Sequence, residues 1–118
     1  MQFALPFPPV SKLSHNARLH WAQRAKLVKA ARREGWALAA EAFAHAPIPD
    51  TRPLPVRFEI HAPDKRRRDL DNIISALKPY CDGIADAIGV DDAHWSHTYT
   101  HAEPIKGGCV IVTIGGEP

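Results

Sequence analysis

The sequence predicts an α+β (α/β) fold, a small mixed β-sheet of about four strands with two main helices packed on it. Two long stretches carry apolar residues at the spacing of an amphipathic helix, and four short stretches are strand-like. Their order along the chain is strand, helix, strand, helix, strand, strand. The chain has 118 residues, which suits a single domain over residues 1–118, because domains commonly contain ~100–150 residues.

The first half of the chain is expected to supply two strands and one helix. Gln2 to Phe7 alternates like a strand until prolines stop it, and a loop is expected over residues 11–18. From about Leu19 to Ala46 apolar residues recur at helical spacing, which predicts one long amphipathic helix. A proline-rich connector over residues 47–55 then leads to a strand, residues 56–61, with one apolar face.

The second half is expected to supply the other helix and the last two strands. Apolar residues from Leu70 toward Ile88 return to helical spacing, and Gly89 is expected to end that helix. Pro79 lacks an amide hydrogen, so a kink or a restart of the helix is expected there. Strands are predicted over residues 95–102 and 109–114.

Composition excludes several classes of protein. No stretch approaches the ~18 consecutive apolar residues of a membrane span, so no membrane association is expected. The N-terminus lacks the features of a secretion signal, which predicts a cytoplasmic location. Cys81 and Cys109 are isolated and are expected to be reduced thiols that are partly buried. No Walker motif is present, so no nucleotide cofactor is expected.

The net charge of +2 conceals a strong asymmetry along the chain. Residues 1–68 contain thirteen Lys and Arg against five Asp and Glu, a charge of +8. Residues 69–118 contain two against eight, a charge of −6. A basic half can follow an anionic polymer and an acidic half can attract cations, although two differently charged solvated surfaces would have the same composition.

Acidic side chains cluster where the two halves of the chain meet. Asp69 and Asp71 stand at the expected start of a helix, directly after four consecutive cations, Lys65, Arg66, Arg67 and Arg68. In an extended entry segment, side chains two residues apart point the same way, so both carboxylates can face one cation. Asp91 and Asp92 can add further carboxylates. A cluster of carboxylates without Cys or His suits Mg²⁺ or Mn²⁺, and adjacent cations can hold phosphates.

Each of these features also has a purely structural explanation. Asp at the start of a helix is most often an N-cap, and Asp-Asp after Gly is common in turns. A short basic run is usually solvated surface. Trp21 and Trp36 are expected to be core or dimer contacts, although an aromatic side chain near DNA can stack on an opened base.

The pattern resembles a known family. Pro63–Ile73, followed after a helix by Asp91–His94, is similar to the signature of the RusA-type Holliday junction resolvases, which are common in prophages. Pro6–Pro9 and Lys106–Gly108 also resemble that family, so the likeness spans nearly the whole chain.

The resemblance implies a homodimeric, Mg²⁺- or Mn²⁺-dependent endonuclease that nicks four-way and related branched DNA junctions in recombination and repair. Asp69, Asp71 and Asp92 would be its catalytic carboxylates, with Asp91 as a further metal ligand. The basic run of residues 65–68 would lie on the DNA.

One position departs from the family pattern. The resolving members carry a catalytic lysine that corresponds to Ser75 here. Lys78 lies seven residues after Asp71, on nearly the same helix face, and is expected to take over that role, the alternative being a solvated helix lysine. The alternative function is a junction-binding architectural protein that has lost cleavage.

Overall fold

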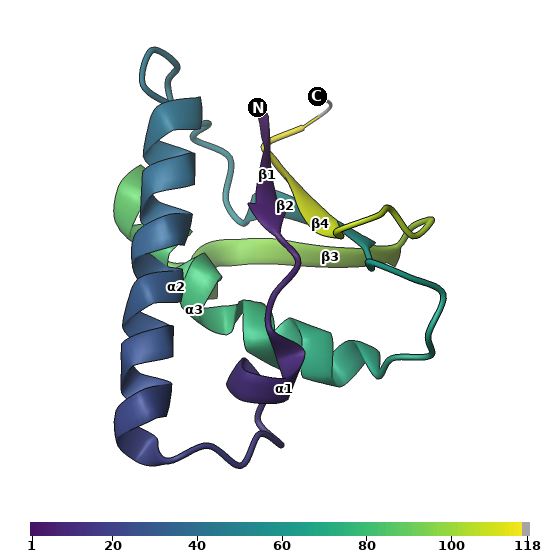
Figure 1. Cartoon of the computed structure of the whole chain (residues 1–118). Coiled ribbons are helices and arrows are strands. Elements are labelled where there is room, and N and C mark those ends of the chain that lie inside the picture. Colours follow the sequence, from purple (N-terminus) through teal and green to yellow (C-terminus); the bar gives the residue numbers. More distant parts are fainter. Residues whose placement is uncertain (117–118) are drawn as a thin grey trace.

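The protein is described by a computed structural model over residues 1–116, in which one sheet is packed against helices (Figure 1). The strands are β1 (Gln2–Pro6), β2 (Leu54–His61), β3 (Trp95–His101) and β4 (Cys109–Ile114). The helices are α1 (Val10–Leu13), α2 (Trp21–Ala42), α3 (Leu70–Ile88) and the short 3₁₀ helix η1 (Asp92–His94). The predicted α+β class, with two main helices and a four-stranded sheet, is confirmed.

The sheet is mixed, with the strand order β1-β4-β2-β3. β2 runs parallel to β3, with Leu54 opposite Trp95, and antiparallel to β4, with Phe58 opposite Val112. β4 also pairs antiparallel with β1. β3 therefore lies at one edge of the sheet.

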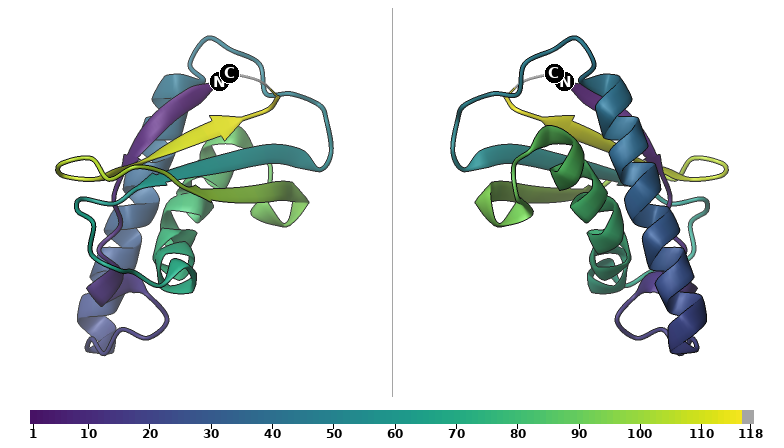
Figure 2. Two further views of the ribbon diagram at one scale, coloured as in Figure 1. Left: turned by 90° about the vertical axis from the view of Figure 1, so that its right-hand side faces the viewer. Right: turned by 90° about the vertical axis from the view of Figure 1, so that its left-hand side faces the viewer.

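The core lies between the sheet and the two long helices. Alternate residues of β2 are fully buried, because one face of this strand packs inward. Phe58 and the neighbouring Ile60 join α3 residues such as Leu77 and Ile84 in one hydrophobic cluster. Burying a side chain of this size stabilises the fold by ~1.5–3 kcal/mol. Both side views show α2 and α3 on the same side of the sheet (Figure 2).

Two glycines allow α2 and α3 to cross at very short range. A Cβ atom on Gly35 would lie 2.2 Å from the carbonyl oxygen of Tyr80. A Cβ atom on Gly83 would lie 1.9 Å from the carbonyl oxygen of Arg32. Real Cβ atoms do not approach backbone so closely, so any larger residue at either position would push the helices apart. The close backbone contacts at Gly35 and Gly83 therefore determine the position of α2 relative to α3.

Pro79 does not interrupt α3, so the expected restart of the helix is wrong. α3 continues from Leu70 to Ile88 and ends at Gly89, which has a φ of 72° and caps the helix as predicted. Proline inside a helix costs ~3 kcal/mol or more. Here Pro79 and neighbours such as Leu77 and Tyr80 are buried, so tertiary packing outweighs the local cost.

Other local expectations were also wrong. Residues 11–18 are not entirely a loop, because α1 extends into them. Trp21 and Trp36 are not core residues, since they are 77% and 50% exposed.

The two cysteines are free thiols as predicted, with Cys81 buried and Cys109 half-buried. Among residues 1–116, no helix is both long enough and apolar enough to cross a membrane.

Candidate functional site

The start of α3 is built by the Asp-x-Asp motif. Asp69 is the N-cap, and its carboxylate accepts a hydrogen bond of 2.9 Å from the backbone N–H of Asp71. Asp71 lies in the first helical turn and is exposed. Negative charge is favourable at this end of a helix, where unpaired N–H groups carry partial positive charge. The structural explanation for Asp69 is therefore observed, and Asp71 faces solvent.

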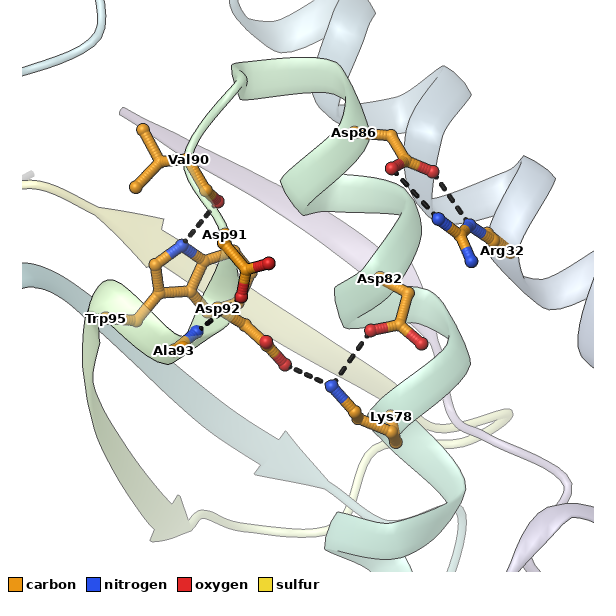
Figure 3. A network of polar contacts seen from close by, with 9 residues as sticks. All are labelled: Arg32, Lys78, Asp82, Asp86, Val90, Asp91, Asp92, Ala93 and Trp95. Carbon is orange, nitrogen blue, oxygen red and sulfur yellow. Dashed lines mark hydrogen bonds and ion pairs between the residues drawn. The ribbon is translucent and has the colours of Figure 1, made fainter.

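The Asp-Asp pair after α3 forms a second cap. Asp91 is exposed and caps η1, because its carboxylate accepts a hydrogen bond of 2.9 Å from the N–H of Ala93. The indole N–H of the buried Trp95 donates to the carbonyl of Val90 at 3.0 Å (Figure 3). These contacts hold the turn in place, and Asp92 points back toward α3 (Figure 3).

Lys78 joins two carboxylates. Its Nζ donates to Oδ1 of Asp82 at 2.9 Å and forms a second, short contact with Oδ2 of Asp92 (Figure 3). The hydrogen bond from Lys78 lowers the pKa of Asp92. The same bond raises the pKa of Lys78, although partial burial acts in the opposite direction. The Asp92 side chain is 21% exposed and that of Lys78 is 57% exposed, so solvent still screens the contact from the lysine side.

Four polar residues form a stripe along α3. Asp71, Ser75, Lys78 and Asp82 follow one another at intervals of four, three and four residues, which is the spacing of one helix face. Sequence reasoning missed Asp82. Its spacing of four residues from Lys78 was the available signal, because oppositely charged side chains at that distance meet on a helix.

Three residues of the stripe, Ser75, Lys78 and Asp82, border a pocket of about 450 Å³ between α2, α3 and β3, together with Asp92. Its polar lining includes Ser75, Lys78, Asp82, Asp92, His97 and Tyr99. Burial raises the pKa of Tyr99 to about 12 and that of the Cys81 thiol to about 12, so both are neutral near pH 7. Charge in the pocket therefore comes chiefly from Lys78, Asp82 and Asp92, called here the ion cluster. Arg24 also lines the pocket and adds a further charge.

Ser75 has a structural role at the position where the resemblance to the RusA type would place a lysine. Its hydroxyl oxygen accepts a hydrogen bond of 3.0 Å from the N–H of His15 and donates to the carbonyl of Asn72 at 3.0 Å. The amide of Asn16 also donates to the side chain of Asn72 at 2.9 Å. These bonds attach the loop after α1 to the first turns of α3.

The structure does not gather the four predicted carboxylates into one metal site. Within residues 1–116, no three side chains of His, Cys, Asp or Glu form a group that could hold a metal ion. Asp69 and Asp91 cap separate helices, whereas Asp92 contacts Lys78. The oxygen donors have the chemistry that Mg²⁺ or Mn²⁺ prefers, but the observed arrangement does not form a complete ligand set.

The basic run before α3 is divided into one fixed cation and three exposed ones. Arg68 donates to Asp64 at 2.9 Å and lies over the ring of Phe7, 5.5 Å from its centroid. This ion pair lowers the pKa of Asp64. Lys65, Arg66 and Arg67 are exposed. Arg68 therefore supports the loop, and the other three remain accessible to phosphates.

The fold and this site define a small α+β protein with an ion cluster in a pocket and a basic loop at the start of the same helix. No family model matches the chain. It is 39% identical over 114 residues to a protein of Xylella fastidiosa (strain Temecula1 / ATCC 700964) that is described as an uncharacterized protein. The alignment covers 95% of this chain and 74% of the Xylella protein. The chain belongs to the family of that protein.

Proposed function

We propose that this protein is a metal-dependent, structure-selective endonuclease of the RusA type, active on four-way and related branched DNA junctions. The observation that carries the proposal is the pocket in which Lys78 and Asp82 of the α3 stripe meet Asp92. An exposed basic loop leads into the same helix. Phosphodiester hydrolysis needs groups that bind phosphate beside groups that manage charge at the reacting centre, and both occur along α3.

The proposed cofactor is Mg²⁺ or Mn²⁺, held by Asp69, Asp71 and Asp92 with Asp91 as a further ligand. When bound, such an ion supplies Lewis-acid polarisation of the phosphate and lowers the pKa of a water nucleophile. To act as a ligand through the oxygen that faces Lys78, Asp92 must give up that ammonium contact. The carboxylates of Asp69 and Asp91 must likewise serve the metal as well as their caps.

The protein's own cations have separate roles in this proposal. Lys65, Arg66 and Arg67 hold the DNA backbone next to the start of α3. Lys78 stabilises negative charge that develops on the phosphate, because an ammonium placed beside the reacting phosphate offsets that charge. The protein is expected to act as a homodimer, whose two sites would cut opposed strands of a junction.

A second candidate is a junction-binding architectural protein without cleavage. Two observations favour it: Ser75 is engaged in hydrogen bonds at the position of the family lysine, and Lys78 is already paired with two carboxylates. Such a protein would retain the basic loop and bind junctions without hydrolysing them.

The test compares a labelled four-way junction with a linear duplex of matched sequence, each incubated with Mg²⁺, Mn²⁺ or EDTA. We expect paired nicks in the junction only when metal is present. Asp71→Asn should abolish nicking while junction binding stays equal or becomes tighter, because the change removes a metal ligand and one negative charge facing phosphates. If Asp71→Asn nicks at the wild-type rate, the metal assignment is wrong. Junction binding without any nicking in either metal would favour the architectural protein.

A further inference from the structure

One face of α2 presents three cations and an indole that the proposed active site does not use. Lys26, Lys29, Arg33 and Trp36 follow one another at intervals of three, four and three residues, so they form one stripe, called here the α2 stripe. Arg24 and Val28 of the same helix line the pocket at α3. The α2 stripe therefore lies on a different side of α2 from that pocket.

The α2 stripe borders a surface hollow of about 560 Å³. Arg32 and Asp86 form its edge, where the guanidinium makes two hydrogen bonds to the carboxylate, of 2.7 and 3.0 Å (Figure 3). Within residues 1–116, the three cations of the α2 stripe form no ion pair. The hollow is thus positively charged.

Trp36 is held in this hollow by the helix crossing. The Cβ position of Gly83 lies only 2.7 Å from the backbone nitrogen of Trp36, so the backbone of α2 is tightly packed there. The side chain is nevertheless 50% exposed. A large aromatic ring on a fixed backbone loses little conformational entropy when a flat ligand stacks on it.

We infer that the α2 stripe binds single-stranded or locally unpaired nucleic acid, with phosphates on the cations and a base stacked on Trp36. Lys26 and Trp36 are ten residues apart, which corresponds to ~15 Å along a helix, enough for a few nucleotides. Paired duplex would offer phosphates but no accessible base face. An acidic protein segment would use the cations but has no requirement for the exposed indole.

A second copy of this chain fits the surface poorly. In a twofold interface the same patch meets itself, so two sets of three cations would face one another. Like charges placed across an interface cost several kcal/mol. The inference rests on the proposed function in one respect, the identification of DNA as the natural ligand. Binding of a single strand itself needs neither metal nor cleavage.

The test uses the full chain and a fluorescein-labelled oligothymidylate in EDTA, with binding followed by anisotropy at several salt concentrations. Lys26→Ala/Lys29→Ala/Arg33→Ala should weaken binding at least tenfold. It should also reduce the slope of log affinity against log salt by about 2, because each lost single-strand phosphate contact contributes ~0.7. Trp36→Ala should weaken binding about 5- to 150-fold, the loss of one base stack, and Trp36→Phe should retain part of it.

The matched control removes the same charge from scattered exposed positions, as Arg18→Ala/Arg57→Ala/Lys106→Ala. It should keep the wild-type salt slope, and circular dichroism verifies that each variant is folded. Equal binding by the α2 and control triples would overturn the inference. Unchanged oligothymidylate binding by Trp36→Ala would also overturn it. If that variant in addition changed the mass of the protein in solution, the surface would be an interface between copies of this chain.

The same preparations separate this inference from the proposed function. Oligothymidylate binding that depends on the α2 stripe, in a wild-type protein that nicks no junction, would refute the nuclease and leave the inference standing. If the wild-type protein nicks junctions in a metal-dependent manner but the α2 triple variant binds the oligonucleotide normally, the inference is refuted and the nuclease stands.

Discussion

Lys78 is the residue whose environment differs most from its sequence expectation. The sequence spacing puts Lys78 on nearly the same face of α3 as Asp71 and Ser75. Its partners were not predicted, because Asp92 approaches only through the turn between α3 and β3. The side chain bridges the helix and that turn instead of projecting freely toward Asp71.

Lys78→Ala is expected to slow single-turnover nicking of a four-way junction by ~10²–10³ with little loss of junction affinity. The reason is the loss of an ammonium that stabilises developing negative charge. Ser75→Lys in that background should restore part of the rate, but not all, because Ser75 also accepts the hydrogen bond from His15. The control is Lys106→Ala, which removes an exposed lysine from the loop before β4 and should keep the wild-type rate. A wild-type rate for Lys78→Ala at saturating enzyme would make Lys78 a purely structural residue.

His61, at the end of β2, is the residue with the clearest pH dependence. Its Nε2 lies 2.8 Å from a carboxylate oxygen of Glu59 and its Nδ1 lies 2.7 Å from the carbonyl of Glu103. Both partners are acceptors, and only the protonated ring can donate from both nitrogens. The bond to Glu59, followed by the one to Glu103, raises the pKa of His61.

We expect NMR titration to give His61 a pKa above the ordinary ~6.5, and Glu59→Gln to lower it. Because the folded pKa is raised, the stabilisation is fully present below pH ~6.5 and is lost as the pH rises through the folded pKa. The difference in melting temperature between wild type and Glu59→Gln should therefore be larger at mildly acidic pH, just below ~6.5, than at alkaline pH. An equal difference at both ends would contradict the assignment.

At the scale of elements, the strands and long helices follow from local patterns. β4 matches its predicted range, and Gly89 ends α3 as expected. Pro79 was misjudged because its cost is local, whereas the compensation comes from burial against other elements. α1 and η1 were missed because helices of four and three residues are too short to show a hydrophobic period.

The start of α3 offers a test that separates a cap from a metal ligand. Asp69→Asn keeps a good N-cap but removes the charge, whereas Asp69→Ala removes both. We expect Asp69→Ala to destabilise the protein by ~1 kcal/mol and Asp69→Asn to change stability little. Both should lose metal-dependent nicking if Asp69 also binds the metal. Retained nicking by Asp69→Asn, measured beside urea unfolding of both variants, would leave Asp69 with the cap alone.

For the whole molecule, the charge asymmetry of the sequence is only partly kept in space, because Asp86 lines the hollow at the α2 stripe and Arg24 lines the pocket at α3. The basic half contributes the loop before α3 and the α2 stripe, whereas the acidic half contributes Asp71, Asp82 and Asp92. Charge counts could predict this division but not the pairing within it. Arg32 and Lys78 are cations whose acidic partners become neighbours only in the fold. Arg68 instead pairs with Asp64, which precedes it by four residues. The expected homodimer stays a prediction.

Joint replacement of Arg66, Arg67 and Arg68 by Ala should weaken binding to DNA of every shape, without regard to sequence. The salt dependence on duplex should become shallower by ~0.9 log unit for each lost phosphate contact. Because Arg68 is paired with Asp64 and covers Phe7, Arg68→Ala alone should change stability more than the salt slope. An unchanged slope for the triple variant would place this loop away from the DNA.

The pairing of β1 with β4 also determines when the fold can close during synthesis. The side chains of Gln2 and Thr113, which hydrogen-bond across these strands, are 111 positions apart. β1 is synthesised before the other strands, yet its partner in the sheet, β4, is the last of them to be made. Until then its apolar side, with Phe3 and Leu5, has no neighbouring strand. The nascent chain must therefore keep this edge from premature contacts, and the synthesis of β4, rather than growth of α2 or α3, sets the earliest moment at which the sheet can be completed.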